Sequence, residues 1–225
     1  MKELYFRQIK AGTMENFVYA VGCMETRECV LIDPAWEVEG LLESLDKDDM
    51  TLTGVLITHY HPDHCGGSMY GFSVQGLPEL MASRPVPVHI NEHEAEGLKK
   101  VTGLSDSDLR IQSSGDTLNV GNIPIQFLHT PGHTPGSQCF KLGNRLISGD
   151  TLFVQGCGRV DLPGGDSDEM YRTLTQKLAT LPDDTILYPG HHYSPEASAT
   201  MEQIKQSNHY LRVSSLDDWR RLMNG

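Results

Sequence analysis

The sequence predicts a protein of the α/β class, in which β-sheets are covered by helices. Two observations support this prediction. Short apolar and β-branched runs recur along the chain, and between them lie longer segments in which apolar residues return every three or four positions. In addition, four of the apolar runs stop abruptly at a loop that contains His or Asp, as a buried strand does where it leaves its sheet.

Each expected element follows from its local pattern. Strands are expected at residues 17–21, 29–32, 54–58, 86–90, 123–128, 138–142, 145–148 and 185–188. Helices are expected at residues 37–46, 92–101, 167–181 and 195–211, where the apolar residues follow the helical period. Asp166 or Ser167 is expected to cap the third helix, because a short oxygen side chain accepts hydrogen bonds from the free N–H groups of a first turn.

The length and composition indicate a globular protein with a sizeable core. The 225 residues fit a single domain over residues 1–225 with a short helical C-terminal end. No N-terminal stretch resembles a signal peptide and no window approaches the length of a membrane span, so we expect the chain in the cytoplasm without a membrane partner. The five scattered cysteines contain no CxxC pair and are expected to be reduced thiols.

The charge of the chain argues against a nucleic-acid partner. The formal net charge is −12, which repels a phosphate backbone, because non-specific affinity for nucleic acid depends on Lys and Arg. The adjacent residues Arg220 and Arg221 are too few to reverse this balance. A nuclease activity is disfavoured for the same reason, and no feature of the sequence indicates an oligomeric state.

The first histidine cluster follows a buried strand directly. The run ending at Thr58 opens into His59-Tyr60-His61-Pro62-Asp63-His64. His59 and His61 are two residues apart, so in an extended segment both imidazoles leave on the same face and can reach one cation. A turn after Pro62 can direct Asp63 and His64 to a neighbouring ion. The cluster therefore predicts two metal ions rather than one.

The same arrangement recurs where three later strands end. His133, Asp150 and His191 each follow an apolar run and a glycine, so we expect four strand ends to converge on one rim. Asp150 is expected between the metals, because a carboxylate bridges where an imidazole cannot. Two cations about 3.5–4 Å apart activate a water and polarise a carbonyl. Imidazole and carboxylate ligands predict zinc as the metal, with iron or manganese as alternatives.

These motifs resemble the metallo-β-lactamase fold. Residues 58–64 match its THxHxDH signature, and HTPGHTPGS, SGDTLF and YPGHHYS follow in the order of the family. The resemblance implies a four-layer αββα sandwich and catalytic roles for Asp63 and Asp150. It further implies one metal held by His59, His61 and His133 and a second held by Asp63, His64 and His191, with Asp150 bridging.

Within this superfamily the chain is most similar to the glyoxalase II branch. That resemblance implies hydrolysis of an acyl-glutathione-like thioester by metal-activated hydroxide, with a thiolate as the leaving group. Arg159 and Tyr193 match the positions that bind the glutathione part of the substrate. The chain departs from the branch in two respects. Asp161 stands where glyoxalase II chains usually carry an aromatic residue. This sequence ends at Gly225, soon after Arg220 and Arg221, whereas glyoxalase II chains usually have a longer helical C-terminal domain with further basic contacts.

Two related families remain as alternatives. The stretch Gly156–Asp161 also resembles persulfide dioxygenases, which oxidise glutathione persulfide with a single iron. The length of the chain is similar to that of the glyoxalase II-like hydrolases of bacillaene-type bacterial polyketide clusters, which would place the acyl group on a carrier protein. An acyl-CoA thioester is a further alternative substrate. Arg159, Arg220 and Arg221 are the residues expected to contact an acidic carrier.

Three further expectations concern residues near the motifs. His129 and His192 adjoin the predicted ligands and are expected to orient them through hydrogen bonds. Residues 91–94 are expected to form a solvated helix start. The long segment 66–85 has two interpretations, a wall of an acyl pocket or a helix packed on the sheet. Its apolar residues are Met69, Tyr70, Phe72, Leu77, Leu80 and Met81.

Overall fold

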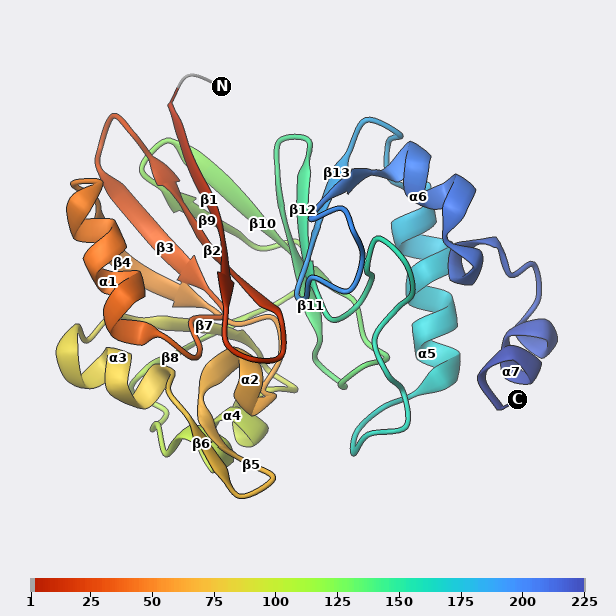
Figure 1. Cartoon of the computed structure of the whole chain (residues 1–225), viewed down its shortest axis with the longest axis horizontal. Coiled ribbons are helices and arrows are strands. Elements are labelled where there is room, and N and C mark those ends of the chain that lie inside the picture. Colours follow the sequence, from red (N-terminus) through yellow and green to blue (C-terminus); the bar gives the residue numbers. More distant parts are fainter. Residues whose placement is uncertain (1–2, 225) are drawn as a thin grey trace.

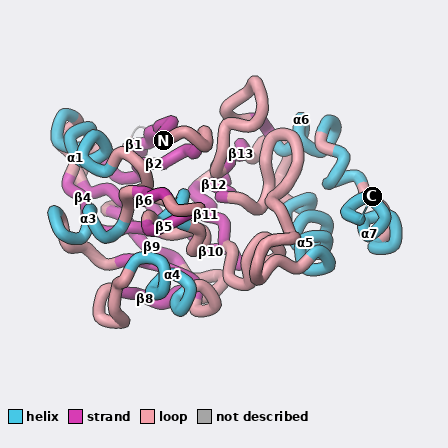
Figure 2. Tube along the Cα trace, turned by 60° about the horizontal axis from the view of Figure 1, so that its bottom comes forward, coloured by secondary structure: helices cyan, strands magenta, loops and turns pink. Residues whose placement is uncertain are grey.

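The computed structural model describes residues 3–224 and contains two six-stranded β-sheets with helices on both outer sides (Figure 1). In a view turned by 60° the helices still lie outside the strands, so the layers are a property of the fold and not of one projection (Figure 2).

The first sheet contains the N-terminal half of the chain. Strands β1 to β3 are antiparallel neighbours, whereas β3, β4, β7 and β8 are parallel. In spatial order the strands are β1 (Leu4–Ala11), β2 (Asn16–Cys23), β3 (Glu28–Ile32), β4 (Thr51–Leu56), β7 (Val88–Asn91) and β8 (Leu109–Gln112). The parallel connections contain α1 (Val38–Lys47), α2 (Pro62–Cys65), the hairpin β5 (Gly67–Met69) and β6 (Phe72–Val74), α3 (Leu77–Ser83) and α4 (Ala95–Thr102).

The second sheet contains the C-terminal half. All its neighbouring strands are antiparallel except β12 and β13, which are parallel. In spatial order the strands are β14 (Ala199–Thr200), β13 (Ile186–Pro189), β12 (Arg145–Gly149), β11 (Gln138–Leu142), β10 (Ile123–His129) and β9 (Thr117–Val120). Its helices are α5 (Ser167–Arg172), which continues through a π turn (Thr173–Lys177) and a 3-10 turn (Leu178–Thr180), α6 (Met201–Ser207), the 3-10 turn His209–Arg212 and α7 (Leu216–Asn224).

Three apolar layers hold these elements together. Phe127 and Ile32 belong to the layer between the two sheets. Leu31, the neighbour of Ile32 on β3, points to the opposite face and packs with α1, α3 and α4. Trp219 of α7 lies with α5 and α6 on the outer face of the second sheet. Both faces of each sheet are thus buried, which confirms the predicted four-layer αββα sandwich.

The predicted elements agree well with the observed ones in the interior. All eight expected strands are present, with ends shifted by at most three residues, and Asp166 caps α5 by accepting a hydrogen bond from the backbone N–H of Glu169. The expected helix 195–211 is wrong at its start, because residues 199–200 pair with β13 as strand β14. Strand β1 was not expected, since Arg7 and Lys10 interrupt its apolar pattern at the edge of the sheet.

The helix interpretation of residues 66–85 is confirmed for one part of the segment, and the acyl-pocket interpretation stays a prediction for the other. Leu77 and Leu80 lie in α3 and are fully buried under the first sheet. Tyr70 and Phe72 lie at the β5–β6 hairpin and are exposed. No helix within residues 3–224 combines the length and hydropathy needed to cross a bilayer.

Because Leu80 is buried and Phe72 is exposed, truncation of these two side chains is expected to change the free energy of unfolding by different amounts. Leu80→Ala removes a side chain that is 0% exposed and is expected to lower the free energy of unfolding by about 2–5 kcal/mol. Phe72→Ala truncates a ring that is 74% exposed and is expected to change it by less than about 0.5 kcal/mol. Urea denaturation monitored by circular dichroism measures both values, and equal losses would contradict this assignment.

Candidate metal centre

The structure brings the four expected strand ends together between the sheets. Gln138 donates a backbone hydrogen bond of 3.0 Å to Thr58, which joins the end of β4 to the start of β11. Gly190 donates one of 2.8 Å to Gly149, which joins the ends of β13 and β12. The loops that carry the histidines are thereby held against one another across the two sheets.

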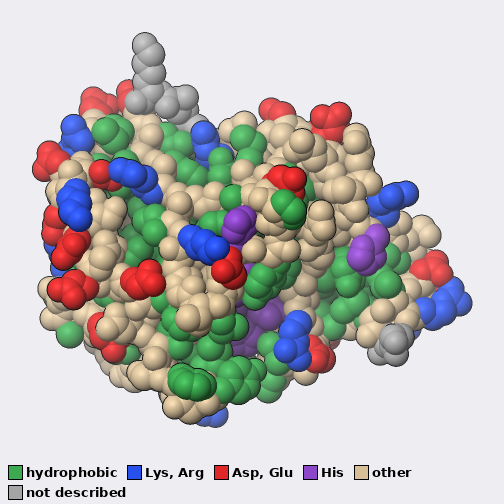
Figure 3. Space-filling view, in the orientation of Figure 1, with side chains coloured by type: hydrophobic (Ala, Val, Ile, Leu, Met, Phe, Trp, Pro, Cys, Tyr) green, Lys and Arg blue, Asp and Glu red, His purple; other side chains and the backbone are tan. Residues whose placement is uncertain are grey.

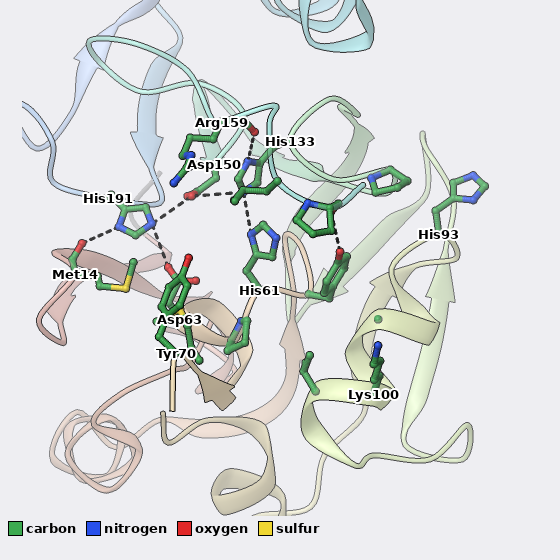
Figure 4. A pocket seen from close by; sticks show the side chains of 18 of the residues that line it. Met14, His61, Asp63, Tyr70, His93, Lys100, His133, Asp150, Arg159 and His191 are labelled. Carbon is green, nitrogen blue, oxygen red and sulfur yellow. Dashed lines mark hydrogen bonds and ion pairs between the residues drawn. The ribbon is translucent and has the colours of Figure 1, made fainter. Parts of the chain in front are cut away.

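The seven predicted ligand side chains lie in one cluster. His59, His61 and His133 form one group, and Asp63, His64 and His191 form another; within each group the donor atoms lie within 4.8 Å of one another. Figure 4 shows Asp63, Asp150, His61, His133 and His191 turned toward a common centre.

Asp150 lies between the two groups. Its Oδ2 is 3.2 Å from Nε2 of His191 and 3.8 Å from Nε2 of His133, and its Oδ1 is 3.3 Å from Nε2 of His64. A single carboxylate therefore reaches imidazoles of both groups, as its predicted bridging position requires.

The donor set fits divalent metal ions. Nε2 of His59 is buried without any hydrogen-bond partner, and so is Oδ1 of Asp150 by hydrogen-bond geometry. Nitrogen atoms of neighbouring imidazoles face each other, at 3.0 Å between His61 Nδ1 and His133 Nε2 and at 3.2 Å between the Nε2 atoms of His64 and His191. Buried groups without partners destabilise a fold, and a metal ion would satisfy these atoms.

Backbone carbonyl groups orient two of the imidazoles. His133 Nδ1 donates to the carbonyl oxygen of Arg159 at 2.7 Å, and His191 Nδ1 donates to that of Met14 at 2.9 Å. Since a carbonyl oxygen only accepts, Nδ1 carries the proton in both rings. In the neutral form of each ring, the Nε2 lone pair then faces the cluster.

A buried aspartate outside the predicted set orients two further imidazoles. Asp33 Oδ2 accepts from His64 Nδ1 at 3.0 Å and from the hydroxyl of Thr58 at 2.6 Å, and its Oδ1 accepts from the backbone N–H of Thr58 at 2.8 Å. Because the hydroxyl proton of Thr58 is used on Asp33, its oxygen is available to accept from His59 Nδ1 at 2.9 Å. Asp33 thus favours, in the neutral rings of His59 and His64, the tautomer in which Nε2 carries no proton.

Glu94 connects two of the ligand loops. Its side chain is 0% exposed and accepts backbone hydrogen bonds from Tyr60 at 2.8 Å and from Gly136 at 2.6 Å. Burial raises the pKa of this carboxyl group, against the effect of these hydrogen bonds. The expected solvated helix start is therefore wrong for Glu94, although Glu92 and His93 are exposed.

The cluster itself shifts the pKa values of its members. Burial lowers the pKa of His59, and it lowers that of His61 to about 4. Burial opposes the ionised form of Asp63 and Asp150, but the adjacent His64 and His191 hold both carboxyl pKa values below their usual range. Burial also opposes the charged form of His64 and His191, but the neighbouring carboxylates raise the pKa of both imidazoles, that of His191 to about 9. The centre thus combines two imidazoles of lowered pKa, two of raised pKa and two ionised carboxylates.

The expected roles of His129 and His192 are wrong. His129 Nε2 donates to the carbonyl oxygen of Pro135 at 2.9 Å, and the ring of His192 lies 5.3 Å from that of Phe17. Asp33 does what they were expected to do. It follows the apolar strand β3 in the same way as Asp150 follows β12, so its position was visible in the sequence.

A cavity of about 790 Å³ opens onto the cluster, and both predicted substrate-binding residues line it. The ring of Tyr193 stacks on that of His191 at 4.5 Å, and burial raises the pKa of its hydroxyl to about 12. Arg159 is held by two hydrogen bonds to Asp161, at 2.9 and 2.8 Å. Figure 3 shows histidine side chains set among hydrophobic ones on this face of the molecule.

Comparison with known families gives one match over most of the chain. Residues 12–191 of this chain match the family described as the metallo-beta-lactamase superfamily. A probable hydroxyacylglutathione hydrolase of Schizosaccharomyces pombe is 33% identical over 95% of this chain and 75% of its own length. The human persulfide dioxygenase ETHE1 is 31% identical over 94% of this chain and 77% of its own length.

Two other comparisons bear on the branch. The probable polyketide biosynthesis zinc-dependent hydrolase BaeB of Bacillus velezensis is 25% identical over 93% of this chain and 87% of its own length. The crystal structure of ETHE1 from Myxococcus xanthus superimposes with a TM-score of 0.82 at 32% identity, covering 98% of this chain and 90% of that one.

The contacts of Asp33 predict its contribution to metal affinity. In Asp33→Asn the amide oxygen can still accept the hydrogen bond from the Thr58 backbone, which turns the amide N–H₂ toward His64 Nδ1. Because an N–H₂ group donates, it favours the His64 tautomer that carries its proton on Nε2, the nitrogen that faces the metal centre. We expect zinc affinity to fall about 10- to 100-fold in competition with a chelator. Asp46→Asn, which removes an exposed ion pair with Arg84, is the control. Unchanged zinc affinity in Asp33→Asn would rule out this role.

Proposed function

The chain belongs to the metallo-β-lactamase superfamily, and we propose that it is a dinuclear metal hydrolase that cleaves a thioester. It is a metal-dependent hydrolase of the glyoxalase II type. The observation that supports the proposal best is the meeting of seven donor side chains beside a cavity large enough for a small substrate.

The proposed ligands divide as the geometry does. One metal is assigned to His59, His61 and His133 and the other to Asp63, His64 and His191, with Asp150 shared. We propose zinc, because neutral imidazoles together with carboxylate oxygens bind it well; iron and manganese, which accept the same donors, are the alternatives. When bound, such a metal pair would lower the pKa of a water so that it loses its proton near neutral pH, and the metals would polarise the carbonyl of the substrate.

The remaining groups of the cavity bind and orient the substrate. Tyr193 keeps its phenolic proton, since its pKa is raised to about 12, and it can donate a hydrogen bond to the substrate. Hydrolysis forms the acyl–oxygen bond and breaks the acyl–sulfur bond, which releases a carboxylate and a thiol. Because a thiolate leaves readily, the reaction needs no strong general acid among the residues of the cavity.

A small-molecule thioester is favoured over one attached to a carrier protein. An acidic carrier would require free cations on the surface of this enzyme. Each of the three arginines considered for that role is paired with an aspartate: Arg159 with Asp161, Arg220 with Asp168 and Arg221 with Asp218. A carrier-bound acyl group, as polyketide biosynthesis would provide, is therefore our second choice of substrate.

A persulfide dioxygenase with one iron is the second candidate function. It is favoured by the similarity to ETHE1 in both sequence and structure. The ion pair between Arg159 and Asp161, at the position where glyoxalase II chains usually have an aromatic residue, is consistent with it.

Metal content and turnover together test the proposal. We expect two zinc ions per chain by elemental analysis and release of free thiol from lactoylglutathione. Asp150→Ala is expected to lower the metal content and reduce turnover at least about 100-fold, because the shared ligand is lost. Asp106→Ala, an exposed aspartate bound to Lys99, is the matched control. One iron per chain, together with oxygen uptake on glutathione persulfide, would overturn the hydrolase in favour of the dioxygenase.

The hairpin at the mouth of the cavity predicts a preference for acyl length. Met69 and Tyr70 line the cavity, whereas Leu80 of the same segment lies in the core. Tyr70→Asp is expected to raise KM several-fold for long-chain acyl thioesters and to leave KM for acetyl thioesters unchanged, because it places a charge beside the chain. Met24→Asp, at an exposed apolar residue outside the cavity, is the control. Equal effects on both substrates would exclude an acyl site at the hairpin.

A further inference from the structure

A buried asparagine contacts one of the proposed metal ligands. Asn16, at the start of β2, donates from Nδ2 to Oδ2 of Asp63 at 3.0 Å and to the backbone oxygen of Asp63 at 3.0 Å. The same Oδ2 lies 3.3 Å from Nε2 of both His64 and His191. Asn16 therefore contacts the carboxylate oxygen that faces the other donors of its group.

The indole of Trp36 determines which way this amide points. Trp36 Nε1 donates to Oδ1 of Asn16 at 3.0 Å and to the backbone oxygen of Asp63 at 3.1 Å. An indole N–H can only donate, so the amide atom that it meets must be the oxygen. The N–H₂ group of Asn16 must then face Asp63. A flipped amide would lose the hydrogen bond from Trp36 as well as those to Asp63.

The backbone around Trp36 holds the indole in place. Trp36 has a φ of 77°, in the left-handed region that bulky residues rarely adopt. Its N–H donates to the carbonyl oxygen of Gln75 at 2.8 Å. The indole also lies directly against Gly12, where a Cβ atom would overlap the ring. Such a conformation persists only when its surroundings enforce it, and strained residues of this kind gather at functional sites.

We propose that Trp36, acting through Asn16, is a positioning residue for Asp63 in the metal centre. The inference rests on the proposed dinuclear centre and goes beyond it, because neither residue is a ligand. The backbone of Asn16 also pairs with that of His191 as an isolated antiparallel bridge, so this residue contacts two members of one group. The metal at Asp63, His64 and His191 depends on Trp36, and the metal at His59, His61 and His133 does not.

The two tryptophans of the chain provide a matched pair of variants. Trp36→Phe removes the indole N–H but keeps an aromatic ring. Trp219→Phe removes an equivalent N–H, which donates to Ser167 at 2.8 and 2.9 Å on the far side of the second sheet. Metal-free samples of both variants and of the wild type are titrated with zinc against a chelator, and their melting temperatures are recorded.

We expect Trp36→Phe to bind one zinc ion as the wild type does and the second about 10- to 100-fold more weakly. Trp219→Phe is expected to bind both ions normally even where its melting temperature falls. Asn16→Ala is a second variant that tests the same contact, with the same selective loss expected. Two normally bound ions in Trp36→Phe, or equal weakening of both ions in either variant, would overturn the inference. A wild type that binds fewer than two ions would overturn the dinuclear centre itself, and the positioning role with it.

Discussion

Burying His59, Asp63 and His64 beside one another removes their contacts with water, and the structure around them compensates for that cost. Isolated charges in such a place are strongly disfavoured, and buried polar atoms need partners. Each imidazole of the cluster except His61 has its outward nitrogen bonded to a hydroxyl, a carboxylate or a carbonyl oxygen. Apart from the hydrogen bond of Asn16 to Asp63, the inward atoms have only one another, which is the arrangement of a centre completed by cations.

The αββα architecture makes this arrangement possible. Loops of both sheets meet along one rim, so residues more than a hundred positions apart, such as His64 and His191, are held at 3.2 Å. Two buried carboxylates then fix the loops from behind. Glu94 ties the loop of His61 to that of His133, and Asp33 orients His59 and His64. The metal centre is therefore a product of packing as much as of its ligands.

The three arginines considered for substrate or carrier binding are each paired with an aspartate. With a net charge of −12, arginines such as Arg159 and Arg220 are drawn to nearby aspartates. The cavity wall consists largely of apolar and aromatic side chains, Tyr70 and Tyr193 among them, and also contains Lys100 and Arg159. This composition favours a substrate with an apolar acyl part over one recognised mainly through its negative charge.

The sequence by itself determined the interior strands and the candidate ligands, because both depend on local pattern. An apolar run that ends in His59-Tyr60-His61-Pro62-Asp63-His64 can be read without knowing what lies beside it. Only the tertiary structure decided which groups hold each ligand side chain in place through hydrogen bonds. The carbonyl oxygens of Met14 and Arg159 carry no side-chain signal, and the contact from Trp36 through Asn16 to Asp63 joins three distant segments. The edge strand β1 and the placement of Glu94 were decided in the same way, since burial there depends on neighbours that a local pattern does not contain.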